Sequence, residues 1–147
     1  MTKGTFIFDV DGTLADNTHR LCHINKAPPD WETYHSLDYL DQPIPDVIGI
    51  AQELHEAGYT VLNVSGRGEE RRQPTEQWLL EALGFSTTLF MRPTGNHKPD
   101  DYIKLQLYRK HIEGKYNVLG IFDDRDRVVA MWRRLGLRCY QVRPGDF

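Results

Sequence analysis

The chain has 147 residues, of which 39% are hydrophobic and 27% charged, and its formal net charge is −3. That length fits one domain with a buried core of its own, and no apolar run approaches the roughly 20 residues that a membrane-spanning helix needs. The acidic balance also excludes the global basic field typical of many nucleic-acid-binding proteins, although a local basic patch is compatible with it.

Apolar residues alternate along the chain between the spacing of strands and the spacing of helices. The predicted strands are 5–10, 59–64, 87–91, 118–122 and 138–142. The predicted helices are 45–57, 74–83, 100–112 and 126–135. Such alternation favours a parallel sheet covered on both faces. The predicted fold class is therefore α/β, a three-layer Rossmann-like domain with a central parallel sheet of about five strands and helices on both faces.

A long polar segment, roughly residues 16–45, interrupts this alternation after the first strand. It contains Trp31, Tyr34 and Tyr39 among several prolines. A loop of this length in a compact domain is usually functional or a small subdomain. We predict a short, partly helical flap over the strand ends, within a single domain that spans 1–147.

The two cysteines, Cys22 and Cys139, show neither metal-ligand spacing nor a disulfide framework. We expect both to be free thiols in a reducing compartment. The first residues lead directly into an apolar run and contain no signal-peptide pattern. These features predict a cytoplasmic protein that does not associate with membranes.

Two carboxylates, Asp9 and Asp11, come at the end of the first predicted strand, and Gly12 and Thr13 follow them. Like charges this close are costly unless a cation lies between them, and Mg²⁺ takes carboxylate oxygens together with substrate phosphate. One carboxylate can then act as a nucleophile and the other can transfer protons. Gly12 permits a sharp turn in which backbone N–H groups can face phosphate oxygens.

Polar residues also follow two other predicted strands. Ser65 and Gly66 come after the second strand, and Arg67 could add a bidentate phosphate contact. The fourth strand ends at Asp123 and Asp124, which could bring further oxygen ligands to the same metal. Parallel sheets bind ligands at the carboxyl ends of their strands. We therefore expect these residues to converge on one site.

Two lysines are candidates for neutralising a bound phosphate. Lys98 lies in the loop before the helix predicted at 100–112, and Lys104 lies near the start of that helix. Asp100 could be the N-cap of the helix, with or without a functional role. These residues alone leave the choice between the two lysines open.

The order of these motifs resembles the haloacid dehalogenase superfamily of phosphatases, and segment 9–13 is its most specific signature. Segments 65–67, 100–104 and 122–147 look like the 3′-phosphatase domains of phage polynucleotide kinase-phosphatases. The similarity covers nearly the whole chain. No Gly-x-x-x-x-Gly-Lys-Ser/Thr phosphate loop occurs in the sequence, so kinase activity is not expected of this chain.

The resemblance implies a role for each motif residue. Asp9 would attack phosphorus and become phosphorylated, while Asp11 would protonate the leaving group, activate water and bind Mg²⁺ through its backbone carbonyl. Asp123 and Asp124 would complete the metal site, with Asp124 coordinating directly. The residues implied to hold the phosphate and thereby assist catalysis are Ser65 and Lys104. The implied substrate-binding residues are Gly12, Thr13, Arg20, Gly66, Arg67 and Asp100, with Asp100 positioning the lysine.

The predicted function is a Mg²⁺-dependent phosphomonoesterase that acts through a phospho-aspartate on Asp9. We favour removal of 3′-phosphates from polynucleotide ends in nucleic-acid repair. An open entrance for such a substrate could be lined by Arg20, Arg67, Arg71, Arg72, Trp31 and Tyr34. One alternative is a phosphatase of nucleoside monophosphates or other small phosphomonoesters. Another is an inactive interaction module, against which the intact acidic and lysine motifs argue.

Overall fold

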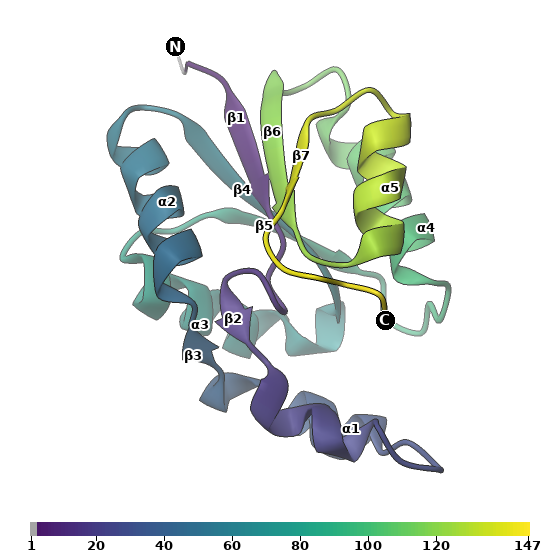
Figure 1. Cartoon of the computed structure of the whole chain (residues 1–147). Coiled ribbons are helices and arrows are strands. Elements are labelled where there is room, and N and C mark those ends of the chain that lie inside the picture. Colours follow the sequence, from purple (N-terminus) through teal and green to yellow (C-terminus); the bar gives the residue numbers. More distant parts are fainter. Residues whose placement is uncertain (1–2) are drawn as a thin grey trace.

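The computed structural model describes residues 3–147, and a five-stranded sheet lies at its centre with the order β5-β4-β1-β6-β7 (Figure 1). Every neighbouring pair in this sheet is parallel. The strands are β1 (Thr5–Phe8), β4 (Thr60–Gly68), β5 (Thr88–Arg92), β6 (Val118–Asp123) and β7 (Cys139–Gln141). The predicted parallel sheet is confirmed.

Helices cover both faces of the sheet. They are α2 (Pro45–Glu56), α3 (Arg72–Leu83), α4 (Asp100–Leu107) and α5 (Asp126–Arg134). Successive strand residues point to opposite faces, so Phe8 packs in the apolar cluster with α2 and α3, and Ile7 packs in the cluster with α4 and α5. Both faces of β1 are therefore buried, and the strand presents its carboxyl end as the place where polar residues can gather.

Several predicted boundaries differ from the structure, among them the end of β1, which comes at Phe8 and not at residue 10. β4 continues to Gly68, so residues 65–67 lie inside the strand, next to a register shift against β5. α3 begins at Arg72, because Pro74 falls in the first turn, where no helical N–H bond is lost. The helix expected at 100–112 is α4 followed by a single π-helical turn, Tyr108–Ile112, and the apolar spacing does not distinguish that turn from regular helix.

The predicted flap is an excursion between β1 and α2 that lies beyond the carboxyl ends of the strands (Figure 1). Its two short strands, β2 (Ala15–Asp16) and β3 (Gln42–Pro43), pair antiparallel and bring its ends together. Between them lie a 3₁₀ helix (Thr18–His23), α1 (Trp31–Ser36) and a second 3₁₀ helix (Asp38–Leu40). A third 3₁₀ helix, Glu69–Arg71, links β4 to α3. Within residues 3–147, no helix is both long enough and apolar enough to cross a bilayer.

The strand order places the candidate site. The chain runs outward from β1 through β4 and β5 and then returns to β6, on the other side of β1. The order therefore reverses between β1 and β6, which is where open α/β sheets bind ligands. Asp9 follows β1, and Asp123 ends β6.

Candidate functional site

Three buried carboxylates meet at the carboxyl ends of β1 and β6. Asp9, Asp123 and Asp124 each offer an oxygen that lies within 4.8 Å of the other two. The Asp9 N–H donates to the Phe122 carbonyl at 3.0 Å, which fixes the first acidic loop to the end of β6. The structure thus brings together the acids that the sequence placed after two separate strands.

Lys104 of α4 lies against two of these acids. Its Nζ donates to Asp9 Oδ1 at 2.8 Å and to Asp123 Oδ2 at 2.9 Å. Burial alone would lower the pKa of Lys104, but the charges of Asp123 and Asp9 raise it, so the amine is protonated at neutral pH. Lys98 is exposed, and its amine lies over the Tyr102 ring. Of the two candidate lysines, Lys104 is therefore the one that reaches Asp9.

The carboxylates of Asp123 and Asp124, at the end of β6, are held in place by residues that the sequence did not point to. Asp123 Oδ2 accepts a hydrogen bond from Trp132 Nε1 at 3.2 Å, and Asp123 Oδ1 accepts one from the Asp124 N–H at 2.9 Å. Asp124 Oδ2 accepts from Arg143 Nε at 2.9 Å. Trp132 is fully buried, and the sequence gave no sign of its polar contact.

This donor set fits a hard divalent cation. Burial, followed by the charge of Asp123, raises the pKa of Asp9 well above its usual value, and the same two causes raise the pKa of Asp124. A cation shared by the three carboxylates would relieve that repulsion. Carboxylate oxygens are the ligands that such cations take in proteins. The aspartate cluster can therefore hold a divalent metal ion.

The turn that follows Asp9 is closed by its own backbone. Thr13 Oγ1 donates to Asp9 Oδ2 at 2.9 Å and orients that carboxylate. The Gly12 N–H donates to the Ala15 carbonyl at 2.8 Å, and the Thr13 N–H donates to the Val10 carbonyl at 3.2 Å. Both N–H groups are therefore bonded within the turn in this structure, and their contact with phosphate oxygens stays a prediction.

Gly12 has a φ of +80°, and a Cβ there would overlap Asp124 and Arg143. We expect Gly12→Ala to lower the free energy of unfolding by about 1–3 kcal/mol and to weaken stabilisation by Mg²⁺, since Asp124 must move. Gly84→Ala is the matched control, because Gly84 has a φ of +84° with nothing near its Cβ position. Thermal unfolding with and without Mg²⁺ measures both effects. An undiminished Mg²⁺ response in Gly12→Ala would contradict this expectation.

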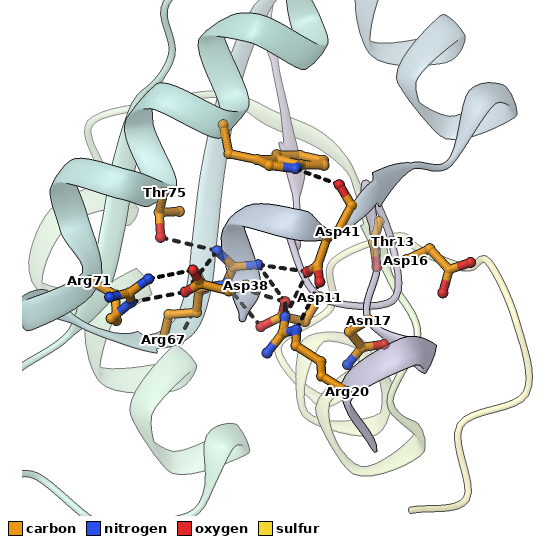
Figure 2. Close-up of polar contacts among 12 residues, drawn as sticks. Asp11, Thr13, Asp16, Asn17, Arg20, Asp38, Asp41, Arg67, Arg71 and Thr75 are labelled. Atoms are coloured by element: carbon orange, nitrogen blue, oxygen red, sulfur yellow. Dashed lines mark hydrogen bonds and ion pairs between the residues drawn. The ribbon is translucent and has the colours of Figure 1, made fainter. Parts of the chain in front are cut away.

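The second motif carboxylate, Asp11, faces the flap and two arginines (Figure 2). Asp11 Oδ1 accepts from Arg20 Nη2 at 2.6 Å and from Arg67 Nη2 at 2.7 Å. Arg67 Nε also donates to both Asp11 oxygens, at 3.1–3.2 Å. Burial would raise the pKa of Asp11, but the charges of Arg67 and Arg20 lower it well below its usual range. Asp11 is therefore ionised in this arrangement.

The arginines of the predicted entrance are all engaged within the protein. Arg20 and Arg67 are 0% and 3% exposed, so both lie behind Asp11 and not on an open surface. Arg71 pairs with Asp38, and Arg72 pairs with Glu69 and Glu76. Tyr34 is buried, with the Arg20 guanidinium 4.2 Å from its ring centroid, whereas Trp31 is exposed. Direct substrate contact by Arg20 or Arg67 stays a prediction.

Ser65 and Gly66 lie in the irregular end of β4, next to β1. Ser65 is buried, and its Oγ accepts a hydrogen bond from the Arg67 N–H at 3.0 Å. A Cβ on Gly66 would press on the Asp100 carboxylate, so this glycine permits the close approach of α4 to β4. These contacts fix the position of Ser65, whose predicted phosphate contact remains a prediction.

Asp100 is not the N-cap of α4, and its implied role in positioning Lys104 stays a prediction. It is the first residue of α4, and the cap position is Pro99, which makes no side-chain cap bond. Its carboxylate pairs with Arg92 and, at 2.9 Å, with Arg125. Asp100 therefore acts on Lys104 through its charge, which contributes to raising the lysine's pKa, while its hydrogen bonds go to the two arginines.

Comparison with known proteins agrees with this geometry. The family model described as "Polynucleotide kinase PNKP phosphatase domain" matches residues 3–147. A candidate bifunctional polynucleotide kinase/RNA ligase of Autographa californica nuclear polyhedrosis virus is 34% identical over 128 residues, which cover 86% of this chain and 17% of the viral protein.

Solved structures give the same result at the level of the fold. A chain in the structure of the Pnkp1/Rnl/Hen1 RNA repair complex superposes with a TM-score of 0.82 at 36% identity, covering 98% of this chain and 44% of that chain. A haloacid dehalogenase-like hydrolase from Streptococcus pneumoniae superposes with a TM-score of 0.62 at 16% identity, covering 94% and 83% of the two chains. The chain thus spans less than half the length of the RNA repair relative and less than a fifth of the viral one.

Proposed function

Because the chain belongs to the family of polynucleotide kinase phosphatase domains, which are phosphoric monoester hydrolases of the haloacid dehalogenase fold, we propose that it removes 3′-phosphates from polynucleotide ends with Mg²⁺ as cofactor. The observation that carries the proposal is the buried Asp9, bonded to Lys104 and within 4.8 Å of Asp123 and Asp124. The nucleic-acid substrate is inferred from the family and from the names of the relatives, one a kinase/ligase and one part of an RNA repair complex.

Asp9 is the proposed nucleophile. One of its oxygens forms a bond to phosphorus while the bond from phosphorus to the sugar 3′-oxygen breaks, which leaves an acyl phosphate on Asp9. Thr13 and Lys104 donate to different oxygens of this carboxylate and fix its orientation. Water then attacks the phosphorus, releasing inorganic phosphate and restoring Asp9.

Lys104 supplies positive charge at the phosphate, and a bound metal ion would add to it. Lys104 is protonated and lies against the nucleophile, and Ser65 can donate a hydrogen bond from the neighbouring strand. Asp9, Asp124 and the backbone carbonyl of Asp11 are the proposed ligands of Mg²⁺, with Asp123 supporting them. A bound Mg²⁺ would neutralise charge on the phosphate oxygens.

Asp11 is the proposed proton carrier. In the structure it is ionised by Arg67 and Arg20, which is the form required of a base that activates water. The negative charge of a bound phosphate opposes that ionisation and raises the pKa of Asp11, so that it can take up a proton and donate it to the leaving 3′-oxygen. The same carboxylate then accepts a proton from the attacking water.

The test compares phosphate release from one oligonucleotide sequence carrying either a 3′-phosphate or a 5′-phosphate, and from the matching nucleoside 3′-monophosphate. We expect Mg²⁺-dependent release from the 3′-phosphorylated oligonucleotide, with activity lost in EDTA and restored by Mg²⁺. Turnover of the mononucleotide as fast as that of the oligonucleotide would instead support a phosphatase of small phosphomonoesters. No hydrolysis of any of the three would support the inactive interaction module.

Cysteine usage is one of the features from which the cytoplasmic location is predicted. In the part of the chain that the structure describes, Cys22 is exposed, Cys139 is buried, and neither forms a disulfide. Both are therefore compatible with a reducing compartment. The location itself stays a prediction.

A further inference from the structure

Two aspartates of the flap are buried as completely as apolar core residues. The side chains of Asp38 and Asp41 are 1% and 0% exposed. The side chains of the two arginines that face them, Arg20 and Arg67, are 0% and 2% exposed. Buried charges are rare unless they are paired, because removing them from water is costly. An arrangement of this kind therefore has a specific geometric role or a marked effect on stability.

Asp41 lies behind both arginines that bind Asp11 (Figure 2). It accepts from Arg20 Nε at 2.8 Å and Arg20 Nη2 at 2.7 Å, and from Arg67 Nη2 at 3.2 Å. The Arg20 Nη2 group thus bridges Asp41 and Asp11, as does Arg67 Nη2. Two planar guanidinium groups shared by two carboxylates leave each group little rotational freedom.

Asp38 constrains Arg67 from the other side. It pairs with Arg67 Nη1 at 3.5 Å, and Arg71 donates to both of its oxygens, at 2.5 and 3.1 Å. Thr75 Oγ1 accepts from Arg67 Nη1 at 3.1 Å. Arg67 is therefore held along its whole guanidinium fork, between the flap and the start of α3.

The flap backbone is attached at the same place. Trp78 Nε1, in α3, donates to the Asp41 carbonyl at 2.8 Å, and His19 Nε2 lies 2.7 Å from Asp41 Oδ1. Three arginines (Arg20, Arg67 and Arg71) balance three aspartates (Asp11, Asp38 and Asp41) in formal charge, and His19 and Tyr34 are further titratable groups in contact with the cluster. Removing one carboxylate breaks that balance and frees the guanidiniums to turn.

We propose that Asp41 and Asp38 are positioning residues, which hold Arg20 and Arg67 at the angle that orients the Asp11 carboxylate for proton transfer. The inference rests on the phosphatase function proposed above, in which Asp11 moves the proton. Without Asp41, Asp11 is the one carboxylate that both guanidiniums share, so the guanidiniums and the Asp11 carboxylate lose their fixed orientation. Asp41 and Asp38 themselves touch no reacting atom.

A pair of small substrates separates positioning from folding. Benzyl phosphate releases an alkoxide-like oxygen that needs a proton in the transition state. In contrast, 4-nitrophenyl phosphate releases a stable anion, whose departure needs little protonation. For Asp41→Asn we expect kcat/KM to fall about 30-fold or more for benzyl phosphate and less than about 3-fold for 4-nitrophenyl phosphate, since general acid catalysis contributes roughly 10²–10⁴-fold. The ratio of the two rates in one sample does not depend on the folded fraction.

Two further variants complete the test. Asp38→Asn should shift the ratio in the same direction by a smaller factor. This variant replaces Asp41→Asn in the test if Asp41→Asn fails to fold, because Arg71 keeps a contact with the side chain at position 38. Asp30→Asn is the matched control, since this flap carboxylate caps α1 through Thr33 and lies outside the cluster. An unchanged ratio in the first two variants, or an equal shift in the control, would overturn the proposal. Failure of the wild-type protein to hydrolyse these two substrates and the 3′-phosphorylated oligonucleotide would overturn the phosphatase function instead.

Discussion

Asp9→Asn is expected to abolish phosphate release, with kcat reduced roughly 10⁴-fold or more, as is usual when a catalytic nucleophile is removed. An amide keeps the shape of the carboxylate but cannot form the acyl phosphate. The variant should stay folded, because losing one buried charge relieves repulsion with Asp123, which is among the causes that raise the pKa of Asp9. Steady-state hydrolysis of 4-nitrophenyl phosphate measures the loss, and thermal unfolding checks the fold.

Chemical trapping provides the control for this result. Acid quenching of the wild-type enzyme with ³²P-labelled substrate should leave label on the protein, and hydroxylamine should remove it, as expected of an acyl phosphate. Asp9→Asn should retain no label. A variant with wild-type turnover would show that the nucleophile is another group, and would remove the covalent mechanism.

Lys104→Met is expected to lower kcat/KM by about 10²–10³-fold, the usual effect of removing a group that stabilises developing charge. Lys98→Met is the matched control, with the same chemical change at an exposed position in the preceding loop, and should leave activity within about 2-fold. Equal losses in the two variants would contradict the assignment of Lys104. A loss confined to Lys98→Met would restore the rejected candidate.

The same substitution should also destabilise the protein, by an amount that depends on metal but hardly on pH near neutrality. Removing one partner of a buried ion pair costs about 3–5 kcal/mol, since Asp9 and Asp123 are left uncompensated. Mg²⁺ should restore part of that loss in Lys104→Met by binding the folded state. Because the folded-state pKa of Lys104 is raised, the wild-type pair contributes fully below about pH 10.4 and is lost only as the pH rises above that value. Thermal unfolding between pH 6 and 9 should therefore show a nearly constant difference in the free energy of unfolding between wild type and variant. Protonation of Asp9 is the one event that changes this difference within that range.

The sheet could be predicted from sequence because its central strands are continuous apolar runs. β1 and the second half of β6 are buried on both faces, and each run ends abruptly at aspartates. The extension of β4 through Gly66 and Gly68 could not be predicted, since glycine has no strand preference and normally marks a break. The length of that strand follows from its pairing with β5, which is a tertiary contact.

The acidic half of the candidate site was equally accessible to sequence analysis, because Asp9, Asp123 and Asp124 each follow a strand. Asp41 was not, since the arginines that it pairs with are 21 and 26 positions away and come from two different elements. Polar residues in a long loop have no periodicity that shows which of them will be buried. The same holds for Asp11, whose motif is obvious but whose contacts depend on how the flap docks.

The position of β1 in the middle of the sheet has a consequence for synthesis on the ribosome. β4 can pair with β1, and β5 with β4, while the rest of the chain is still being made, but the other edge of β1 must wait for β6. Until then that edge offers unpaired N–H and C=O groups, which makes the nascent chain prone to mispairing and a natural client for chaperones. Asp9 and Lys104 are 95 positions apart, so a partly translated chain cannot hydrolyse anything, and enzymatic activity reports on complete folding of the sheet.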